Sequence, residues 1–258
     1  MTADQPAATH DAAYFDQWYA DMGDSAVYDA FVSRTLGLPP ELQSTSLLTW
    51  QGIAEVTAAL HLRDDAQLLD LACGRGGYGI EIARRTDARL IGIDFSAIAL
   101  EQARLRAARL LPPDRADFRV GSLRETGLPA GIADALMCID AVQFAEPPLA
   151  AMLEFRRLLR SGGFLVITCW EAVDPSDDRV PSRIRAVNLR RDLPAAGFVD
   201  VYVHDKLDWR EVERKMWEAA VAEPADSDPA MQSLQAEGRW SLDNFDALRR
   251  VFATATAP

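Results

Sequence analysis

Short apolar runs alternate with amphipathic helical patterns through the middle of the chain. The runs have the length of buried strands, and the segments between them repeat apolar residues at helical spacing. This alternation predicts an α/β fold, in which a mostly parallel sheet carries helices on both faces. The strand-like runs are residues 67–72, 89–95, 117–120, 133–140 and 164–170, and the helix-like segments are 77–86, 96–111 and 147–160.

The two flanks of this alternating region have different patterns. Residues 10–61 are predicted as helices, broken at Gly23 and at Leu38-Pro39-Pro40, and they are rich in aromatic side chains. After the alternating region, residues 199–205 and the end of the chain have strand-like patterns, with helical stretches between them. We therefore expect one domain (1–258) with an N-terminal helical lid (10–61), a core (65–206), a helical insertion (208–248) and a last strand (249–258).

Charge and hydropathy narrow the class of partner. The net charge is −12, from 39 acidic and 27 basic side chains. This disfavours nucleic acid as a partner, because its phosphates need Lys and Arg for neutralisation. No apolar run approaches the roughly 18 residues of a membrane span, and the acidic N-terminus does not resemble a targeting peptide. We therefore expect a cytoplasmic protein with no membrane partner.

Cysteine and histidine give no sign of a metal site or a disulfide framework. The three cysteines form no C-x-x-C pair, and the histidines, His10, His61 and His204, are scattered along the chain. We expect no bound metal, and we expect the cysteines to be buried at strand ends.

The stretch LLDLACGRGGYG (68–79) joins a predicted strand to a predicted helix and contains the candidate ligand site. Gly74, Gly76 and Gly79 spell the G-x-G-x-x-G of a dinucleotide turn, in which glycine lets a ligand lie against the backbone. Asp70 suits an ammonium group better than a pyrophosphate. Asp94 ends the next strand, where it can accept both hydroxyls of a ribose. These residues alone are compatible with either a nicotinamide dinucleotide or S-adenosylmethionine as the ligand.

The ordered set of segments resembles the class I S-adenosylmethionine-dependent methyltransferases, in the small-molecule branch similar to the ubiquinone and menaquinone C-methyltransferases. The glycine turn is similar to the family's first motif, LIGIDFS to its second-strand motif, and FRVGSLRETGLP to the segment that flanks adenine. ADALMCIDAVQF, LEFRRLLRSGGFLVITCWE, AAGFVDVYVHD and VFATATA match the later strands in order.

The resemblance implies a Rossmann-like fold with a seven-stranded sheet, and S-adenosylmethionine as the cofactor. Gly79 is then expected to be only a helix residue. The implied cofactor contacts are Asp70, Ala72, Gly74, Gly76, Asp94, Phe95, Gly121, Ser122, Leu123, Asp140 and, on the helix before the first strand, Gln51.

The sequence departs from the family pattern at several positions. Ala72 replaces the first glycine of the motif, and Ser161 replaces a proline. Ser122 stands where the family often has an acidic residue that accepts a hydrogen bond from the adenine amino group. Gln143 and Phe144 occupy the place of one or two histidines near the substrate. We therefore expect a site that acts mainly by proximity or takes its base from elsewhere.

Asp140, at the end of the fourth strand, and Gln143 are the candidate catalytic residues, and Gln143 is also a candidate for substrate binding. Tyr14 and Trp18 are four residues apart on a predicted helix, so they either close over the substrate as a lid or pack on the core. Trp170, which ends the fifth strand, is a candidate wall of the substrate pocket.

The expected function is methyl transfer from S-adenosylmethionine to an oxygen, nitrogen or carbon atom of a small molecule, in secondary metabolism. The helical additions support a small-molecule partner, because they could enclose a pocket. Two alternatives stay open: an NAD-dependent oxidoreductase, and a non-methylating protein of this fold that serves as a binding subunit or a cyclase. A homodimer is also considered.

Overall fold

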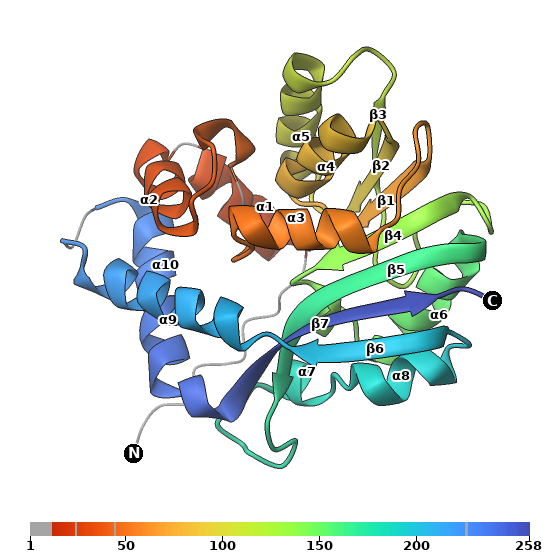
Figure 1. Cartoon of the computed structure of the whole chain (residues 1–258). Coiled ribbons are helices and arrows are strands. Elements are labelled where there is room, and N and C mark those ends of the chain that lie inside the picture. Colours follow the sequence, from red (N-terminus) through yellow and green to blue (C-terminus); the bar gives the residue numbers. More distant parts are fainter. Residues whose placement is uncertain (1–11, 24, 44, 225–226) are drawn as a thin grey trace.

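Seven strands form one sheet in the computed structural model, which describes residues 12–23, 25–43, 45–224 and 227–258 (Figure 1). The strand order is β3-β2-β1-β4-β5-β7-β6, and β7 is antiparallel to both of its neighbours. This confirms the predicted mostly parallel, Rossmann-like sheet. The strands are β1 (Gln67–Leu71), β2 (Arg89–Asp94), β3 (Ala116–Val120), β4 (Ala133–Ile139), β5 (Leu159–Ala172), β6 (Val199–Asp205) and β7 (Leu248–Thr256).

Helices cover both faces of the sheet, because successive strand residues point to opposite sides and both sides are apolar. Leu68 and Met137 pack on one face with α3 (Trp50–Ala59), α4 (Gly77–Thr86) and α5 (Ala97–Leu110). Leu69 and Leu136 pack on the other face with α6 (Pro148–Leu158) and α8 (Leu189–Ala195). The order of strands reverses between β1 and β4, the place where open α/β sheets bind ligands at their carboxyl ends.

A helical cap is built from both flanks of the chain. The N-terminal helices α1 (Ala12–Gly23) and α2 (Ala26–Leu36) contact α9 (Leu207–Ala222) and α10 (Pro229–Asp243), the two helices inserted between β6 and β7 (Figure 1). This confirms the predicted N-terminal helical segment and insertion. Short helices complete the fold: η1 (Pro40–Leu42), η2 (Val142–Phe144), α7 (Ser182–Arg185) and η3 (Phe245–Ala247).

Most predicted elements have the expected bounds, and one boundary is wrong. Ser96 caps α5 as predicted, because its hydroxyl accepts a 3.1 Å hydrogen bond from the Ala99 amide. The helix predicted to run to Arg160 ends at Leu158, and β5 begins at Leu159. The reason is that Leu159 already pairs with Ala133 across an irregular register, so the sheet continues through the glycine turn.

Within the described ranges, no helix combines the length and the apolar character that crossing a bilayer requires.

Candidate cofactor and substrate site

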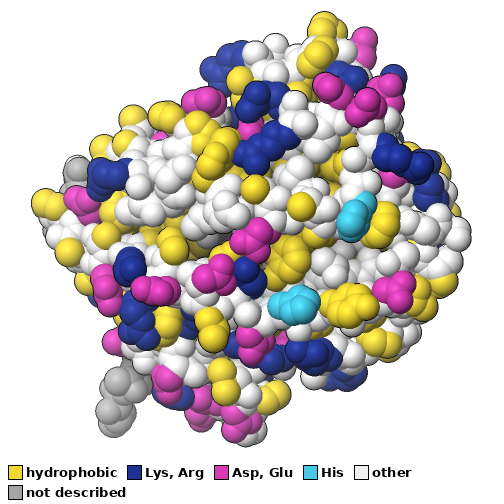
Figure 2. Space-filling view, viewed as in Figure 1, with side chains coloured by type: hydrophobic (Ala, Val, Ile, Leu, Met, Phe, Trp, Pro, Cys, Tyr) yellow, Lys and Arg dark blue, Asp and Glu magenta, His cyan; other side chains and the backbone are white. Residues whose placement is uncertain are grey.

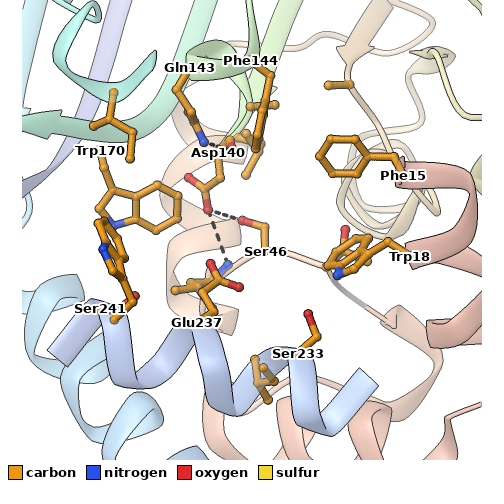
Figure 3. A pocket seen from close by; sticks show the side chains of 18 of the residues that line it. Phe15, Trp18, Ser46, Asp140, Gln143, Phe144, Trp170, Ser233, Glu237 and Ser241 are labelled. Carbon is orange, nitrogen blue, oxygen red and sulfur yellow. Dashed lines mark hydrogen bonds between the residues drawn. The ribbon is translucent and has the colours of Figure 1, made fainter. Parts of the chain in front are cut away.

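A cavity of about 560 Å³ lies between the carboxyl ends of the strands and the helical cap (Figure 3). Its sheet side is formed by residues that follow or end β1, β2, β4 and β5, namely Ala72, Asp94, Asp140 and Trp170. Its cap side is formed by α1, α7, α9 and α10. Segments from both flanks and from the core therefore line one cavity, and its size is typical of small-molecule sites.

The glycine turn after β1 is held by the end of β2. The Gly74 amide donates a 2.8 Å hydrogen bond to the Asp94 carboxylate, and the Cys73 amide donates to the Ile93 carbonyl. Gly74 and Gly76 have φ values of +51° and +75°, which favour glycine. Ala72 also has a positive φ, +58°, so its replacement of the family glycine places an alanine in the left-handed region.

Asp94 keeps acceptor capacity for a ligand. Its carboxylate accepts hydrogen bonds from the Gly74 and Ser96 amides, and it lines the cavity. A carboxylate has about four lone-pair sites, so Asp94 keeps capacity to accept a hydrogen bond from a ligand. Burial raises the pKa of Asp94, although the amide hydrogen bonds favour its ionised form.

Asp70 lies behind the turn, beside a second, smaller cavity that shares Ser46 and Ala72 with the first. Its side chain is buried, and burial together with the Asp94 charge raises the pKa of Asp70 to about 7. Gly79 has a larger role than the sequence suggested. A Cβ at Gly79 would lie 2.5 Å from the Asp70 carboxylate, so glycine is required there to let the carboxylate approach the helix.

Asp140 is placed on the cavity wall, as predicted, but its carboxylate is heavily engaged. It lies 2.6 Å from the Arg250 guanidinium, accepts a 2.6 Å hydrogen bond from Thr168, and accepts another from the Ser46 hydroxyl. A carboxylate held by three protein groups in this way is fixed in its orientation. Its catalytic role stays a prediction, and the geometry favours a positioning role.

Gln143 also lines the cavity, and its side-chain amide donates a 2.7 Å hydrogen bond to the Asp140 carbonyl. Its Oε1 atom is buried and has no hydrogen-bond partner among the described residues. This leaves one acceptor for a substrate donor, which supports the predicted substrate contact.

The aromatic residues of α1 do form the cover of the cavity. Tyr14, Phe15 and Trp18 line it, and the Phe15 ring packs edge-on against Phe95 and Phe144 at centroid distances of 5.2 and 5.3 Å. Phe95 therefore touches the cap as well as the cofactor side of the cavity. Trp18 also packs against the core, and the role of Tyr14 and Trp18 as a lid over the substrate stays a prediction.

Tyr19 is a site residue that the sequence reasoning did not single out. It is buried at the cavity, and its hydroxyl would lie 2.6 Å from a Cβ added at Gly74. Burial, followed by the Asp94 charge, raises the pKa of Tyr19, so the phenol stays a neutral hydrogen-bonding group at the glycine turn. In the sequence, its position on the predicted aromatic helix is the only indication that it belongs to the site.

Trp170 is held as a wall of the cavity by a polar network. Its indole N–H donates a 2.7 Å hydrogen bond to Glu213, and the Arg250 guanidinium lies 4.0 Å from the ring centroid. Glu213 also lies 3.0 Å from Arg210. These contacts fix the orientation of the indole, as the predicted substrate wall requires.

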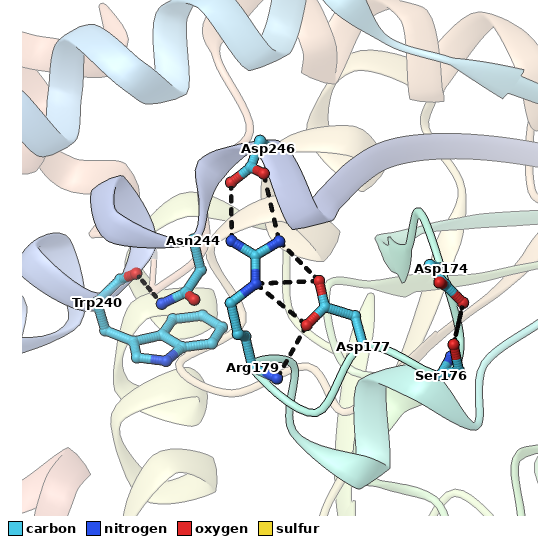
Figure 4. A network of polar contacts seen from close by, with 7 residues as sticks. All are labelled: Asp174, Ser176, Asp177, Arg179, Trp240, Asn244 and Asp246. Carbon is cyan, nitrogen blue, oxygen red and sulfur yellow. Dashed lines mark hydrogen bonds and ion pairs between the residues drawn. The ribbon is translucent and has the colours of Figure 1, made fainter.

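The loop after β5 leads to the cavity residues of α7 and is tied to η3, the short helix that follows α10 (Figure 4). Arg179 contacts Asp177 at 2.7 Å and Asp246 at 3.3 Å, and the Asn244 side chain donates to the Trp240 carbonyl. Exposed ion pairs contribute little individually. Here the Arg179–Asp246 pair connects the loop after β5 to η3.

Several predicted contacts do not lie at the cavity. Gln51 is exposed on α3 and lines neither cavity. Ser122 is exposed and closes a turn by accepting a 3.0 Å hydrogen bond from the Glu125 amide, and Leu123 packs into the core beside α6. With Gly121, these residues line neither cavity, so the adenine-flanking role of the segment stays a prediction.

The described histidines are surface residues. His61 and His204 are exposed, and Figure 2 shows histidine side chains at the surface among interspersed acidic and basic groups. His10 lies outside the described residues. Across the described parts of the chain, no three His, Cys, Asp or Glu side chains are grouped to hold a metal ion. Cys138 and Cys169 are buried and Cys73 is partly buried, and all three are free thiols.

Comparison with known proteins agrees with this geometry. The family described as "Methyltransferase domain" matches residues 68–163. Sterol 24-C-methyltransferase of Debaryomyces hansenii is 27% identical over 119 residues, which are 46% of this chain and 32% of that protein. The chain thus spans about a third of the length of such curated relatives.

Solved structures share the fold over nearly the whole chain. Phosphoethanolamine N-methyltransferase 2 of Haemonchus contortus is 18% identical, with a TM-score of 0.77 over 96% of this chain and 60% of that one. The 4+2 cyclase SpnF is 20% identical, with a TM-score of 0.72 over 96% of both chains. Geranyl diphosphate C-methyltransferase of Streptomyces coelicolor A3(2) is 20% identical, with a TM-score of 0.63 over 81% and 79%.

These findings favour the methyltransferase reading of the glycine turn over the nicotinamide alternative. They do not separate out the ubiquinone and menaquinone branch, which stays a prediction. Residues 68–163 thus match the methyltransferase domain family, and the fold is the one found in solved methyltransferase structures.

Proposed function

We propose that this chain binds S-adenosylmethionine at the glycine turn and transfers the methyl group to a small molecule held in the same cavity. The observation that carries the proposal is Asp94. Its carboxylate holds the Gly74 amide at 2.8 Å, keeps acceptor capacity and faces the cavity that the cap encloses. A ribose hydroxyl is a donor that suits such an acceptor.

Residues around the turn fit the other groups of such a cofactor. Asp70 lies behind the turn, where an ammonium group would favour its ionised form. Tyr19 places a neutral hydroxyl at Gly74. When bound, S-adenosylmethionine supplies a methyl group on a positively charged sulfur that is already activated for displacement.

The task of the protein is then alignment and exclusion of water. The cap helices enclose the chamber, and the Asp140–Arg250 pair and Trp170 form a fixed wall opposite them. An acceptor held against this wall reacts at a high effective concentration. We propose a small-molecule acceptor because the cavity is enclosed by the cap; the cytoplasmic location, the homodimer and the link to secondary metabolism stay predictions.

Methyl transfer tests this proposal directly. The purified protein is incubated with S-adenosylmethionine labelled on its methyl group and with a fractionated extract of small molecules, and labelled products are separated by mass. We expect label in at least one small molecule, in an amount that depends on the enzyme. Tight binding of S-adenosylhomocysteine with no transfer to any fraction would contradict catalysis while leaving the cofactor site intact.

A second candidate function is cyclisation with a bound cofactor that is not consumed. SpnF is similar over 96% of both chains, and neither of the described histidines lines the cavity. The labelling experiment separates the two functions, because a cyclase leaves the label on the cofactor.

A further inference from the structure

Helix α10 turns a polar stripe toward the interior of the molecule. Ser233, Glu237 and Ser241 are four residues apart, so they share one face of the helix, and all three line the cavity (Figure 3). A helix that only covers a core presents apolar residues inward. Three polar residues on the cavity face therefore suggest that this surface contacts a polar ligand.

Among the residues that the structure describes, the carboxylate of Glu237 has no hydrogen-bond or ion-pair partner. No hydrogen bond or ion pair among the described residues reaches Glu237, whereas the other cavity carboxylates are all engaged. Asp94 holds the glycine turn, Asp140 pairs with Arg250, and Glu213 binds Trp170 and Arg210. Glu237 is the acid that the described network leaves available.

Glu237 is accessible to a ligand and lies among protein groups that shift its pKa. Its side chain is accessible and lines the cavity, where Figure 3 shows it projecting from α10 on the side that faces Ser46 and Asp140. Burial by the protein around the cavity raises the pKa of Glu237 to about 6, with Arg183 of α7 opposing this shift and Glu213 of α9 adding to it. A carboxylate with such a pKa is ionised at neutral pH and still basic enough to take a proton.

We propose that Glu237 contacts the acceptor heteroatom of the substrate and removes its proton, which makes the substrate an amine or a hydroxyl compound with an apolar body. This inference rests on the proposed function. A lone pair of the nitrogen or oxygen forms the new bond to the methyl carbon. The carbon–sulfur bond breaks, and its electron pair stays on sulfur, which becomes a neutral thioether. The proton of the heteroatom passes to the Glu237 carboxylate and then to water.

The walls around Glu237 agree with this class of substrate. Trp170, Trp217 and Trp240 line the same cavity and offer aromatic surface to an apolar body. The guanidinium of Arg183 lies 4.8 Å from the centroid of the Phe144 ring and forms no ion pair with Glu237. The carboxylate thus stays free for a donor from the substrate.

The test compares three probes of similar size on the complex with S-adenosylhomocysteine: phenethylamine, 2-phenylethanol and ethylbenzene. Binding is followed by tryptophan fluorescence, and the amine and alcohol arms identify the heteroatom. The Glu237→Gln variant keeps the shape of the side chain, and Glu218→Gln, an exposed glutamate of the insertion that does not line the cavity, is the matched control.

We expect Glu237→Gln to weaken binding of the amine or the alcohol about 10-fold or more, because a hydrogen bond to a charged acceptor is lost. Binding of ethylbenzene and of S-adenosylhomocysteine should be unchanged, and Glu218→Gln should behave as the wild type. Binding of the preferred probe should also strengthen as the pH rises through about 6, and only when Glu237 is present.

Equal binding of the preferred probe by the wild type and Glu237→Gln would overturn the proposal, as would wild-type protein that binds none of the polar probes more tightly than ethylbenzene. Failure of the proposed function has a different signature, since the wild type would then not bind S-adenosylhomocysteine.

Discussion

Among individual residues, Asp70 shows most clearly how the fold changes the chemistry of a side chain. The sequence places it at the end of β1, and the structure buries it against α4 at Gly79. Burial, followed by the nearby Asp94 charge, raises the pKa of Asp70 to about 7. The protein therefore holds a carboxyl that is ready to ionise when a cation arrives.

This shift makes the stability of the ligand-free protein depend on pH. Between the unfolded pKa of about 4 and the folded value of about 7, the folded protein keeps a proton that the unfolded chain has lost. The stability contributed by Asp70 is therefore full below about pH 4 and is lost as the pH rises through 7, by up to about 1.4 kcal/mol per pH unit. The Asp70→Asn variant should lack this loss.

Urea unfolding of the wild type and Asp70→Asn between pH 5 and pH 8 measures the effect. We expect the free energy of unfolding of the wild type to fall relative to that of Asp70→Asn as the pH rises to 7. Above pH 7 the difference between the two proteins should be constant. A difference that does not change with pH would show that Asp70 is ionised throughout.

Among the structural elements, α1 decides whether the cavity is covered. Asp16 of α1 accepts a 2.5 Å hydrogen bond from Ser96, the N-cap of α5, and the Gln102 side chain of α5 donates a 3.1 Å bond to the Tyr19 carbonyl. The negative carboxylate also lies at the positive end of the helix dipole. These contacts fasten the cover to the strand–helix unit that carries Asp94.

Removal of this carboxylate should loosen α1 without unfolding the core. We expect Asp16→Ala to increase the rate of limited proteolysis within α1 roughly 10-fold, which corresponds to the loss of one charge-assisted hydrogen bond. Asp21→Ala is the matched control, because the carboxylate of Asp21 accepts a hydrogen bond from Gln17 of the same helix. Equal cleavage rates for Asp16→Ala and the control would exclude a fastening role for Asp16.

Buried arginines connect the N-terminal segment to the glycine turn. Arg75 of the turn lies 2.7 Å from Asp29 of α2, and Arg106 of α5 donates to the carbonyls of Arg75 and Glu41 and to the Gln43 side chain. The apolar periodicity of the sequence does not predict such contacts. Through them the N-terminal segment is attached to the glycine turn and forms part of the site.

For the molecule as a whole, the sequence was sufficient for the sheet, because each strand is an apolar run bounded by turns. The α6–β5 boundary was missed, since the pairing of Leu159 with Ala133 depends on a neighbouring strand. The glycine turn, Asp70 and Asp94 could be predicted because they are close in sequence and their chemistry is local. They form the half of the site that we propose binds the cofactor.

The substrate half of the site could not be predicted from the sequence in the same way. Glu237, Glu213 and Arg183 come from three separate helices, and nothing in the local pattern tells a cavity glutamate from a solvated one. Gln51 shows the reverse error, because this position on the helix before β1 is exposed in the fold and lines neither cavity. Only the packing of the insertion on α1 brings the polar stripe of α10 to the carboxyl ends of the strands.

The central claim is that the glycine turn and Asp94 form an S-adenosylmethionine site. Calorimetric titration with S-adenosylhomocysteine and with NADH, on the wild type and Asp94→Ala, tests it most directly. We predict that the wild type binds S-adenosylhomocysteine and not NADH, and that Asp94→Ala weakens this binding by about 1–3 kcal/mol through a lost charge-assisted hydrogen bond. Tight binding of NADH alone, or an unchanged affinity in Asp94→Ala, would contradict the account.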